Sequence, residues 1–295
     1  MKKLFLLLAC IATSSVWAAP LVLQSDFGVK DGAVAEMKGI AVGVSPTIVL
    51  HDLSHHNTPF NIWEAAYRLK QTAPYWPEGT VFVSVIDPGV GTERKSVVLK
   101  TRSGHFFVTP DNGTLTLVAE ELGIEAVREI DETKHRRSGS NRSYTFHGRD
   151  VYAYMGAKLA AGVTTFDDVG PLLPPQVVAL PYEKPRRDGA GIVGTIPYLD
   201  FQYGNVWTNL DDALFEQLGV QPGEKLRVVI RHADEMVYEG VVPYARTFGE
   251  VPEGEPLLYL NSLMNVALAL NMGDFARTHQ ISYGAEWSIR VEPVR

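Results

Sequence analysis

The sequence predicts two domains: an N-terminal α/β domain with a central, mostly parallel sheet, and a smaller, mostly antiparallel β domain. Three observations lead to this prediction. In residues 20–174, short apolar segments alternate with segments of helical periodicity, which is typical of strands joined by helices. Residues 175–189 are proline-rich and without periodicity, as expected for a linker. In residues 190–295, strand-like segments follow one another with one short helical segment between them, which favours an antiparallel arrangement.

The individual elements follow from local patterns. Strands are expected where short runs are rich in apolar and β-branched residues, and helices where apolar residues recur every three or four positions. In the N-terminal domain the expected strands are residues 21–26, 47–50, 81–86, 95–101, 104–110 and 126–130, and the expected helices 32–44, 61–73, 114–123 and 151–162. Asp31 is expected to cap the first helix. In the C-terminal domain the strand-like segments are 191–210, 224–232, 235–242 and 287–294, with a helix at 211–219.

The first nineteen residues have the pattern of a cleaved secretory signal. They contain two lysines, an apolar segment and small residues before position 19. The apolar segment is too short to span a bilayer comfortably, so no membrane association is expected of the mature protein. Cys10 is the single cysteine of the chain, and its loss with the signal excludes disulfides and thiolate chemistry. We therefore expect an exported protein, in a compartment such as a bacterial periplasm.

The overall charge argues against a nucleic-acid partner. The 295-residue chain has a formal net charge of −7, whereas binding to a phosphate backbone requires clustered positive charge. Residues 134–142 are locally basic, but their serine and glycine content favours a solvated loop.

The stretch from Thr80 to Arg94 is the most informative part of the chain. An apolar, β-branched-rich run is followed directly by Asp87 and a glycine-rich loop that ends in Arg94. A continuous apolar run of this kind is typical of a strand covered on both faces. Ligands of open α/β sheets bind outside the carboxyl ends of such strands. We expect Asp87 at the mouth of a pocket with Arg94 beside it. The alternative is an ion pair that only stabilises the loop.

Two further residues stand at positions typical of a site. Asp26 ends the first strand, where its two oxygens could accept from both hydroxyls of a ribose diol or could merely stabilise a turn. His147 lies at or just before a helix N-terminus, where the amides of Gly148 and Arg149 face an incoming anion. A histidine at a helix start is often structural, so a functional role for His147 requires that it lies near Asp87 and Arg94.

A second cluster of chemically active residues follows the second expected strand. His51, Asp52, His55 and His56 lie within six positions, and such residues can bind a metal ion. His55 and His56 are adjacent, however, and neighbours on an extended chain point to opposite sides. We predict no metal site, and keep a metal-dependent hydrolase that uses His51, Asp52 and His55 as an alternative.

Two polar turns in the C-terminal domain also have the composition of a binding site. Residues 200–205 combine Asp200, aromatic residues, a glycine and Asn205, and an asparagine amide can pair bidentately with an adenine edge. Asn261, Ser262 and Asn265 form a second polar turn before an apolar run. Taken singly, each is compatible with ordinary turn chemistry.

Taken together, these motifs resemble one enzyme family. Asp26, DPGVGTER, PDNG, TFHGRD, DFQYGN and LNSLMNVALA occur in this order, and the chain is similar over almost its whole mature length to the S-adenosyl-L-methionine (SAM) hydroxide adenosyltransferases. These SAM hydrolases are related to the SAM-dependent fluorinase and chlorinase. The resemblance implies an α/β domain followed by a smaller β domain. It also implies a homotrimer whose active sites lie between the N-terminal domain of one subunit and the C-terminal domain of its neighbour.

The resemblance also implies roles for individual residues. Asp87, Arg94 and His147 would handle the attacking water, and Asp26 would hold the ribose hydroxyls. The methionine end of SAM would lie at Asp200 and Ser262, and adenine at Asn205 and the backbone near Met272. The remaining implied residues are the walls of the pocket, Phe60, Phe146, Tyr203 and Phe248, and the amide-bearing Gly148.

The implied reaction is hydrolysis of SAM to adenosine and L-methionine by water attack at ribose C5′, with SAM or a related adenosyl compound as substrate and no cofactor. The chain departs from the halogenating relatives at Tyr203, Leu270 and Met272, while Asp87 and His147 favour water over halide. Two further alternatives remain at this point: an exported nucleoside-binding protein with little catalysis, and a halogenase.

Overall fold

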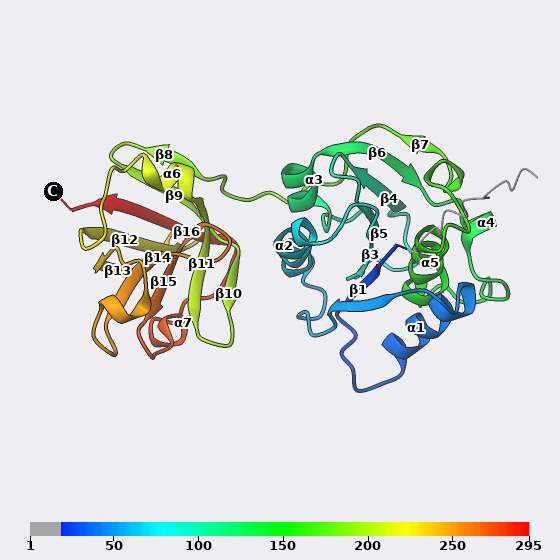
Figure 1. Ribbon diagram of the computed structural model, residues 1–295, viewed down its shortest axis with the longest axis horizontal. Coiled ribbons are helices and arrows are strands. Elements are labelled where there is room, and N and C mark those ends of the chain that lie inside the picture. Colours follow the sequence, from blue (N-terminus) through cyan, green and yellow to red (C-terminus); the bar gives the residue numbers. More distant parts are fainter. Residues whose placement is uncertain (1–18, 295) are drawn as a thin grey trace, which may run out of the picture.

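A computed structural model describes residues 19–294 of the chain as two lobes joined by an extended segment (Figure 1). The signal sequence predicted at residues 1–19, with Cys10, lies outside the described residues except for its last position. No helix within residues 19–294 combines the length and the apolar character needed to cross a membrane.

The N-terminal lobe is built around a mixed sheet. Its strand order is β2-β1-β3-β5-β4-β6-β7, with the neighbours among β2, β1, β3 and β5 parallel and the remaining neighbours antiparallel. The strands are β1 Leu21–Ser25, β2 Leu50–Ser54, β3 Val81–Val85, β4 Ser96–Thr101, β5 Phe106–Pro110, β6 Ile124–Glu129 and β7 Leu172–Leu173. The predicted α/β domain with a largely parallel sheet is confirmed, and its antiparallel part is formed by β4, β6 and β7.

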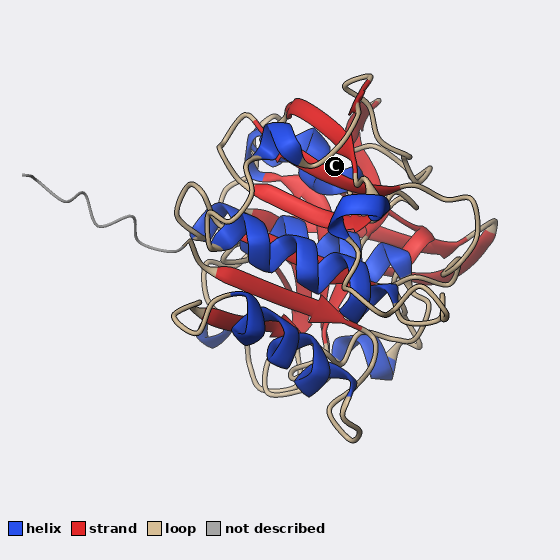
Figure 2. Ribbon diagram, turned by 90° about the vertical axis from the view of Figure 1, so that its right-hand side faces the viewer, coloured by secondary structure: helices blue, strands red, loops and turns tan. Residues whose placement is uncertain are grey.

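Helices cover both faces of this sheet (Figure 2). On one face, α1 and α5 bury Met37 and Met155 against Leu21 and Val83, whereas on the other face Leu69 of α2 packs with residues such as Phe82. Consecutive strand residues therefore enter different cores, which explains why the run at 81–86 is apolar throughout. The helical segments are α1 Ala33–Val44, α2 Ile62–Thr72, η1 Ala73–Tyr75, α3 Thr116–Leu122, α4 Glu132–His135, η2 Gly148–Ala153, α5 Tyr154–Ala160 and η3 Phe166–Asp168.

Two helix starts differ from the prediction. Gly32, and not Asp31, occupies the N-cap position of α1. Asp31 lies one residue before the cap, and its carboxylate accepts a hydrogen bond from the Ala33 amide at 3.0 Å. The helix expected at 151–162 begins at Gly148 with a π-helical turn, η2, before it continues as α5. π-helical turns inside helices occur frequently at functional sites, and this one brings His147 to the first position before the helix.

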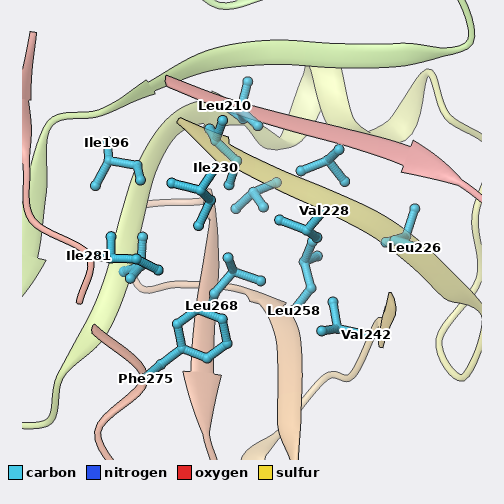
Figure 3. Close-up of a cluster of buried hydrophobic side chains, with 14 of the residues drawn as sticks. Ile196, Leu210, Leu226, Val228, Ile230, Val242, Leu258, Leu268, Phe275 and Ile281 are labelled. Atoms are coloured by element: carbon cyan, nitrogen blue, oxygen red, sulfur yellow. The ribbon is translucent and has the colours of Figure 1, made fainter. Parts of the chain in front are cut away.

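The C-terminal lobe is antiparallel, as predicted. Its two sheets enclose a mainly aliphatic core that also contains Phe215, Phe275 and Trp287. Both sheets contribute side chains to it (Figure 3). One sheet has the order β10-β11-β15-β14 and the other β13-β12-β16-β9-β8. The strands are β8 Arg186–Asp188, β9 Gly191–Ile196, β10 Tyr198–Asp200, β11 Asn205–Asp211, β12 Lys225–His232, β13 Glu235–Pro243, β14 Pro256–Leu260, β15 Asn265–Leu270 and β16 Gly284–Pro293.

The expectation of a single short helix in this domain is wrong. Besides α6 Asp212–Glu216, the chain forms α7 Phe275–Thr278 and the 3₁₀ turn η4 Phe248–Glu250. Helix α7 is four residues long, too short for helical periodicity to show, and its start is set by Asp274, whose carboxylate accepts from the Arg277 amide. Strand β8 lies within the predicted linker and pairs with β9.

Specific contacts join the two domains. The indole nitrogen of Trp63 in α2 donates to the Pro197 carbonyl at 2.9 Å, and Tyr67 stacks on Tyr198. The Tyr283 hydroxyl donates to the buried Glu64 carboxylate at 3.1 Å. These contacts connect α2 with Pro197 between β9 and β10, with β10 itself and with the segment before β16, so that the domains meet along one side of α2.

We expect Gly156→Ala to destabilise the N-terminal domain. A Cβ at Gly156 would lie 2.3 Å from the Cγ2 atom of the fully buried Val83, and such overpacking costs about 1–3 kcal/mol. This cost exceeds the gain in helix propensity of about 1 kcal/mol. The matched control is Gly39→Ala on the exposed side of α1, where a Cβ has no neighbour within 4 Å. Denaturant titration should show a lower midpoint for the first variant and an equal or higher one for the second.

Candidate functional site

The pair formed by Asp87 and Arg94 lies at the carboxyl end of the central strand β3. Arg94 Nε donates to Asp87 Oδ1 at 2.9 Å and Nη2 to Oδ2 at 2.5 Å, so the contact is bidentate. The connecting loop turns at Gly91, whose φ of +78° suits glycine. Burial alone would lower the pKa of the Arg94 guanidinium, but the hydrogen bonds and charge of Asp87 outweigh burial and raise it. The predicted proximity of these two residues is confirmed.

His147 is almost completely buried beside this pair. Its ring is 3 % exposed, and Nδ1 has no hydrogen-bond partner within residues 19–294. Burial lowers the pKa of His147; the Glu132 carboxylate opposes this shift, and the Arg94 and Arg136 guanidinium groups reinforce it. The lowered pKa favours the neutral ring, a state in which a histidine can both donate and accept a hydrogen bond.

Asp87 and His147 share a cavity of about 310 Å³ at the end of the parallel strands. Arg94 contacts Asp87 but is not among the residues that line the cavity, so it acts on the cavity through Asp87. The lining includes the predicted site residues Asp26, Phe60, Asp87, Phe146, His147 and Gly148, together with Phe27, Pro59, Val85, Val90 and Thr145, which the sequence did not single out.

The rim of this first cavity has an unusual backbone conformation. Phe60 has a φ of +68° and its ring is 70 % exposed, a combination that is rare for a bulky residue. The Phe60 amide donates to Asp26 Oδ2 at 2.8 Å. Asp26 therefore holds the rim in place with one carboxylate oxygen.

Gly148 brings the helix close to the cavity wall. A Cβ at this position would lie 3.1 Å from Val85 Cγ1 and 3.2 Å from the rings of Phe27 and Phe146. These distances are shorter than ordinary van der Waals contact, so a larger residue would displace the wall. The absence of a side chain here allows η2 to pack directly against the end of β3.

A second, larger cavity of about 840 Å³ lies on the C-terminal domain. Asn205 is buried there and donates from Nδ2 to Asp200 Oδ2 at 3.1 Å. Met272 is 84 % exposed and, like Phe60, has a positive φ, at +58°. The lining contains the predicted residues Asp200, Tyr203, Asn205, Phe248, Ser262 and Met272, together with Gln202, Tyr259, Asn261, Leu270, Asn271, Gly273 and Asp274.

The predicted residues thus form two half-sites. All of them except Arg94 line one of the two cavities, and neither cavity is lined by a residue of the other domain. Each cavity is also open to solvent on one side. Within residues 19–294 of a single chain, the two sets of side chains do not meet in one pocket.

The alternative metal site has no support in the geometry. His55 is buried, with Nδ1 2.6 Å from Ser25 Oγ and Nε2 3.1 Å from Asp52 Oδ1, and Asp52 also pairs with Lys38 at 2.6 Å. The His51 ring packs edge-on against Trp76. Among the residues that the structure describes, no group of three or more His, Cys, Asp or Glu side chains could hold an ion.

The expectation that residues 134–142 form a solvated loop is wrong for Arg136. Its side chain is 8 % exposed and donates to Glu132 Oε2 at 2.8 Å, four residues earlier. Its Nη1 also lies 3.4 Å from His147 Nε2. The Glu–Arg spacing of four residues is typical of a helical ion pair, and this was the signal in the sequence that could have placed Arg136 on a short helix.

Comparison with known proteins gives matches over both domains. Residues 21–170 match the model of the SAM hydroxide adenosyltransferase N-terminal domain, and residues 194–288 match the model of the C-terminal domain. A crystal structure of an uncharacterized conserved protein from Thermotoga maritima superposes with a TM-score of 0.84 at 33 % identity, covering 92 % of this chain and 99 % of that one.

The similar curated proteins are of two kinds. An (R)-S-adenosyl-L-methionine hydrolase from Salinispora arenicola is 36 % identical, over 84 % of this chain and 89 % of its own. The (R)-S-adenosyl-L-methionine hydrolase of Methanocaldococcus jannaschii is 46 % identical over 143 residues, which are 47 % of this chain and 52 % of its own. A fluorinase from Actinoplanes sp. is 28 % identical, over 90 % of this chain and 95 % of its own.

Proposed function

The chain belongs to the SAM hydroxide adenosyltransferase family, and we propose on this premise that it hydrolyses SAM to adenosine and L-methionine by attack of water at ribose C5′. The observation that supports this assignment is the position of Asp87 and His147 on one cavity, with Arg94 bound to Asp87. The three residues come from different parts of the chain, and the fold brings them together at the carboxyl end of β3.

The nucleophile is the difficult part of this reaction. The sulfonium of SAM leaves as neutral methionine and needs no proton, so a general acid is not required. Water is a poor nucleophile, and formation of free hydroxide at pH 7 costs about 12 kcal/mol, from a pKa of about 15.7. A positioned base contributes about 10²–10⁴ in rate, and fixed in-line geometry removes roughly 7–11 kcal/mol of the barrier. Both contributions are needed.

The first cavity supplies these two contributions. Arg94 fixes the direction of the Asp87 carboxylate, the carboxylate and the neutral His147 ring orient the water, and the carboxylate receives its proton. The Asp87–Arg94 pair is largely dehydrated, with side-chain exposures of 5 % and 12 %, which strengthens its field at the reacting atoms. As the water gains hydroxide character, the approaching sulfonium adds a favourable charge.

The other predicted residues bind the substrate. Asp26 lies on the cavity wall and binds the ribose hydroxyls, while Phe60, Phe146 and Gly148 enclose the sugar. In the second cavity, Asp200 and Ser262 bind the methionine end, and Asn205 with the backbone near Met272 binds adenine. Tyr203 and Phe248 form the walls around the adenine.

A complete site requires two subunits. SAM must contact both cavities, but each is lined by one domain only and both rims carry exposed apolar side chains, Phe60 on the first and Tyr203, Phe248 and Met272 on the second. We infer a homotrimer in which the first cavity of one subunit faces the second cavity of the next. A head-to-tail contact of this kind forms a ring when the rotation between neighbouring subunits closes, as it does about a threefold axis.

Substitution of the water-handling residues should lower kcat without a comparable loss of SAM affinity. We expect Asp87→Ala and His147→Ala each to reduce kcat by about 10²–10⁴-fold, the contribution of a positioned base. Incubation with SAM and chromatographic measurement of adenosine gives kcat, and calorimetric titration gives the affinity.

The same assay tests the remaining alternatives. Binding of SAM with no adenosine formed by the unmodified protein would identify it as a binding protein. A 5′-halo-adenosine product in the presence of chloride or fluoride would identify it as a halogenase. Unchanged turnover in either alanine variant would remove that residue from the mechanism.

The two-subunit site predicts complementation between inactive variants. His147→Ala disables the first cavity and Asn205→Ala the second, so each variant alone should be inactive or weak. After dissociation and random reassembly of an equal mixture, about one site in four combines two intact halves, because each half is intact with even odds in a heterologous ring. Recovery of adenosine formation supports the shared site, and a mixture no more active than its components contradicts it.

We also propose that the protein acts after export, in the periplasm of a bacterial cell. The support is the pattern of residues 1–19, two lysines followed by an apolar segment and small residues. The substrate there is SAM or a related adenosyl compound. Expression with the leader intact should release a shortened protein by osmotic shock, whereas retention of an uncleaved chain in the cell interior would contradict the proposal.

A further inference from the structure

A second ion pair lies next to His147, on the side of the Arg136 guanidinium. Arg136 Nη1 is 2.8 Å from Glu132 Oε2 and 3.4 Å from His147 Nε2, and the same glutamate oxygen is 3.8 Å from Nε2. The guanidinium is further fixed by a 2.6 Å hydrogen bond from Nη2 to the Ser143 carbonyl, and it lies over the Tyr144 ring at 4.4 Å. These contacts give Arg136 one orientation.

The pair is also connected to the other side of the site. Ser96 Oγ accepts from Arg94 Nη1 at 3.2 Å and donates to Glu132 Oε1 at 3.5 Å. The polar groups thus form a continuous chain from Asp87 through Arg94, Ser96, Glu132 and Arg136 to His147. Its formal charges alternate in sign and cancel, which leaves the histidine as the uncharged last member.

The chemistry of arginine fixes the state of the ring. A guanidinium has donors only and does not lose its proton in proteins. The nitrogen that faces it, Nε2, must therefore present its lone pair, and the single proton of the neutral imidazole must be on Nδ1. This is the nitrogen that has no partner within the described residues.

We propose that Glu132 and Arg136 are positioning residues for the reaction: they place the proton of the neutral His147 ring on Nδ1 and keep the ring uncharged. Neither residue lines the cavity, so both act through the histidine. The inference rests on the proposed function for its catalytic meaning, whereas the state of the ring is a property of the protein alone.

The charges around His147 determine the direction of each expected change. The groups that face it are Asp87 after β3, Arg94 in the following loop, Glu132 and Arg136 at the two ends of α4, Tyr144 in the loop before η2, and Tyr152 in η2. Arg136 disfavours a protonated ring and Glu132 favours one. Loss of Arg136 also frees Glu132 to accept a hydrogen bond from a protonated Nε2, which would reverse the tautomer.

The direct test is a pH titration of the His147 ring by ¹⁵N NMR, with its signals assigned by their loss in His147→Asn. In the unmodified protein we expect a neutral ring protonated on Nδ1 at pH 7 and a midpoint below that of an ordinary histidine. Arg136→Gln should raise the midpoint and move the proton toward Nε2, and Glu132→Gln should lower the midpoint. Lys134→Gln makes an equal charge change two residues before Arg136, at a side chain that is 69 % exposed, and should change neither.

The kinetic test uses the pH dependence of kcat/KM for SAM. A positive charge on the His147 ring would weaken the neighbouring Asp87 carboxylate as proton acceptor, so the acid limb should move to higher pH in Arg136→Gln and to lower pH in Glu132→Gln, with KM unchanged. At pH 7 we expect kcat of Arg136→Gln to fall by about 10-fold or more, because a ring with the reversed tautomer no longer orients the water for proton transfer to Asp87. A purely structural role would lower the amount of active protein without moving the acid limb in opposite directions.

The outcomes separate this inference from the proposed function. If the unmodified protein forms no adenosine, the proposed function fails, and the NMR titration still decides the state of the ring. A proton on Nε2 in the unmodified protein, or equal midpoints in Arg136→Gln and Glu132→Gln, would overturn the inference. If Arg136→Gln does not fold, Arg136→Lys replaces it: the retained charge should keep the midpoint low, and a midpoint raised to that of an ordinary histidine would contradict the proposal.

Discussion

The bidentate contact between Asp87 and Arg94 is the interaction around which the site is built. A carboxylate at the end of a buried strand is costly unless it is paired and hydrogen-bonded, and the planar fork of arginine satisfies both oxygens at once. The loop can return to the strand end because Gly91 has a positive φ. The result is a carboxylate with a fixed direction before substrate arrives, so little reorganisation is required during the reaction.

The position of a residue at the end of a strand or the start of a helix explains which parts of the site could be predicted from the sequence. Asp87 was expected at the mouth of a pocket because it follows a buried strand, and in the structure it lines the first cavity together with Asp26, which follows the neighbouring parallel strand. His147 was expected at a helix start because the helical pattern of residues 151–162 follows it. The resemblance of the motifs to a known family supplied the C-terminal half-site, where turn composition alone did not distinguish Asp200 or Ser262 from ordinary turn residues.

The features that were missed depend on packing between distant segments. Arg136 lies in a basic, serine-containing stretch that reads as solvated, and its burial results from contacts with Glu132, Ser143 and the Tyr144 ring. The π-helical turn at 148–153 has no signature in local propensity, and the close approach of Gly148 to Val85 is visible only in the folded chain. In both cases the sequence showed the residues, and only the tertiary structure showed which surface they face.

The hydrogen bond from the Phe60 amide to Asp26 links the order of the cavity rim to binding in the cavity. A left-handed conformation at a bulky residue stores about 1–3 kcal/mol of strain, which the surroundings must hold. One oxygen of Asp26 restrains the rim while the carboxylate also lines the first cavity, so for any ligand that binds this carboxylate, affinity and the order of the rim are thermodynamically coupled. Removal of the Asp26 side chain would then free Phe60 as well as remove a ligand contact, and the affinity lost would overstate the strength of that contact.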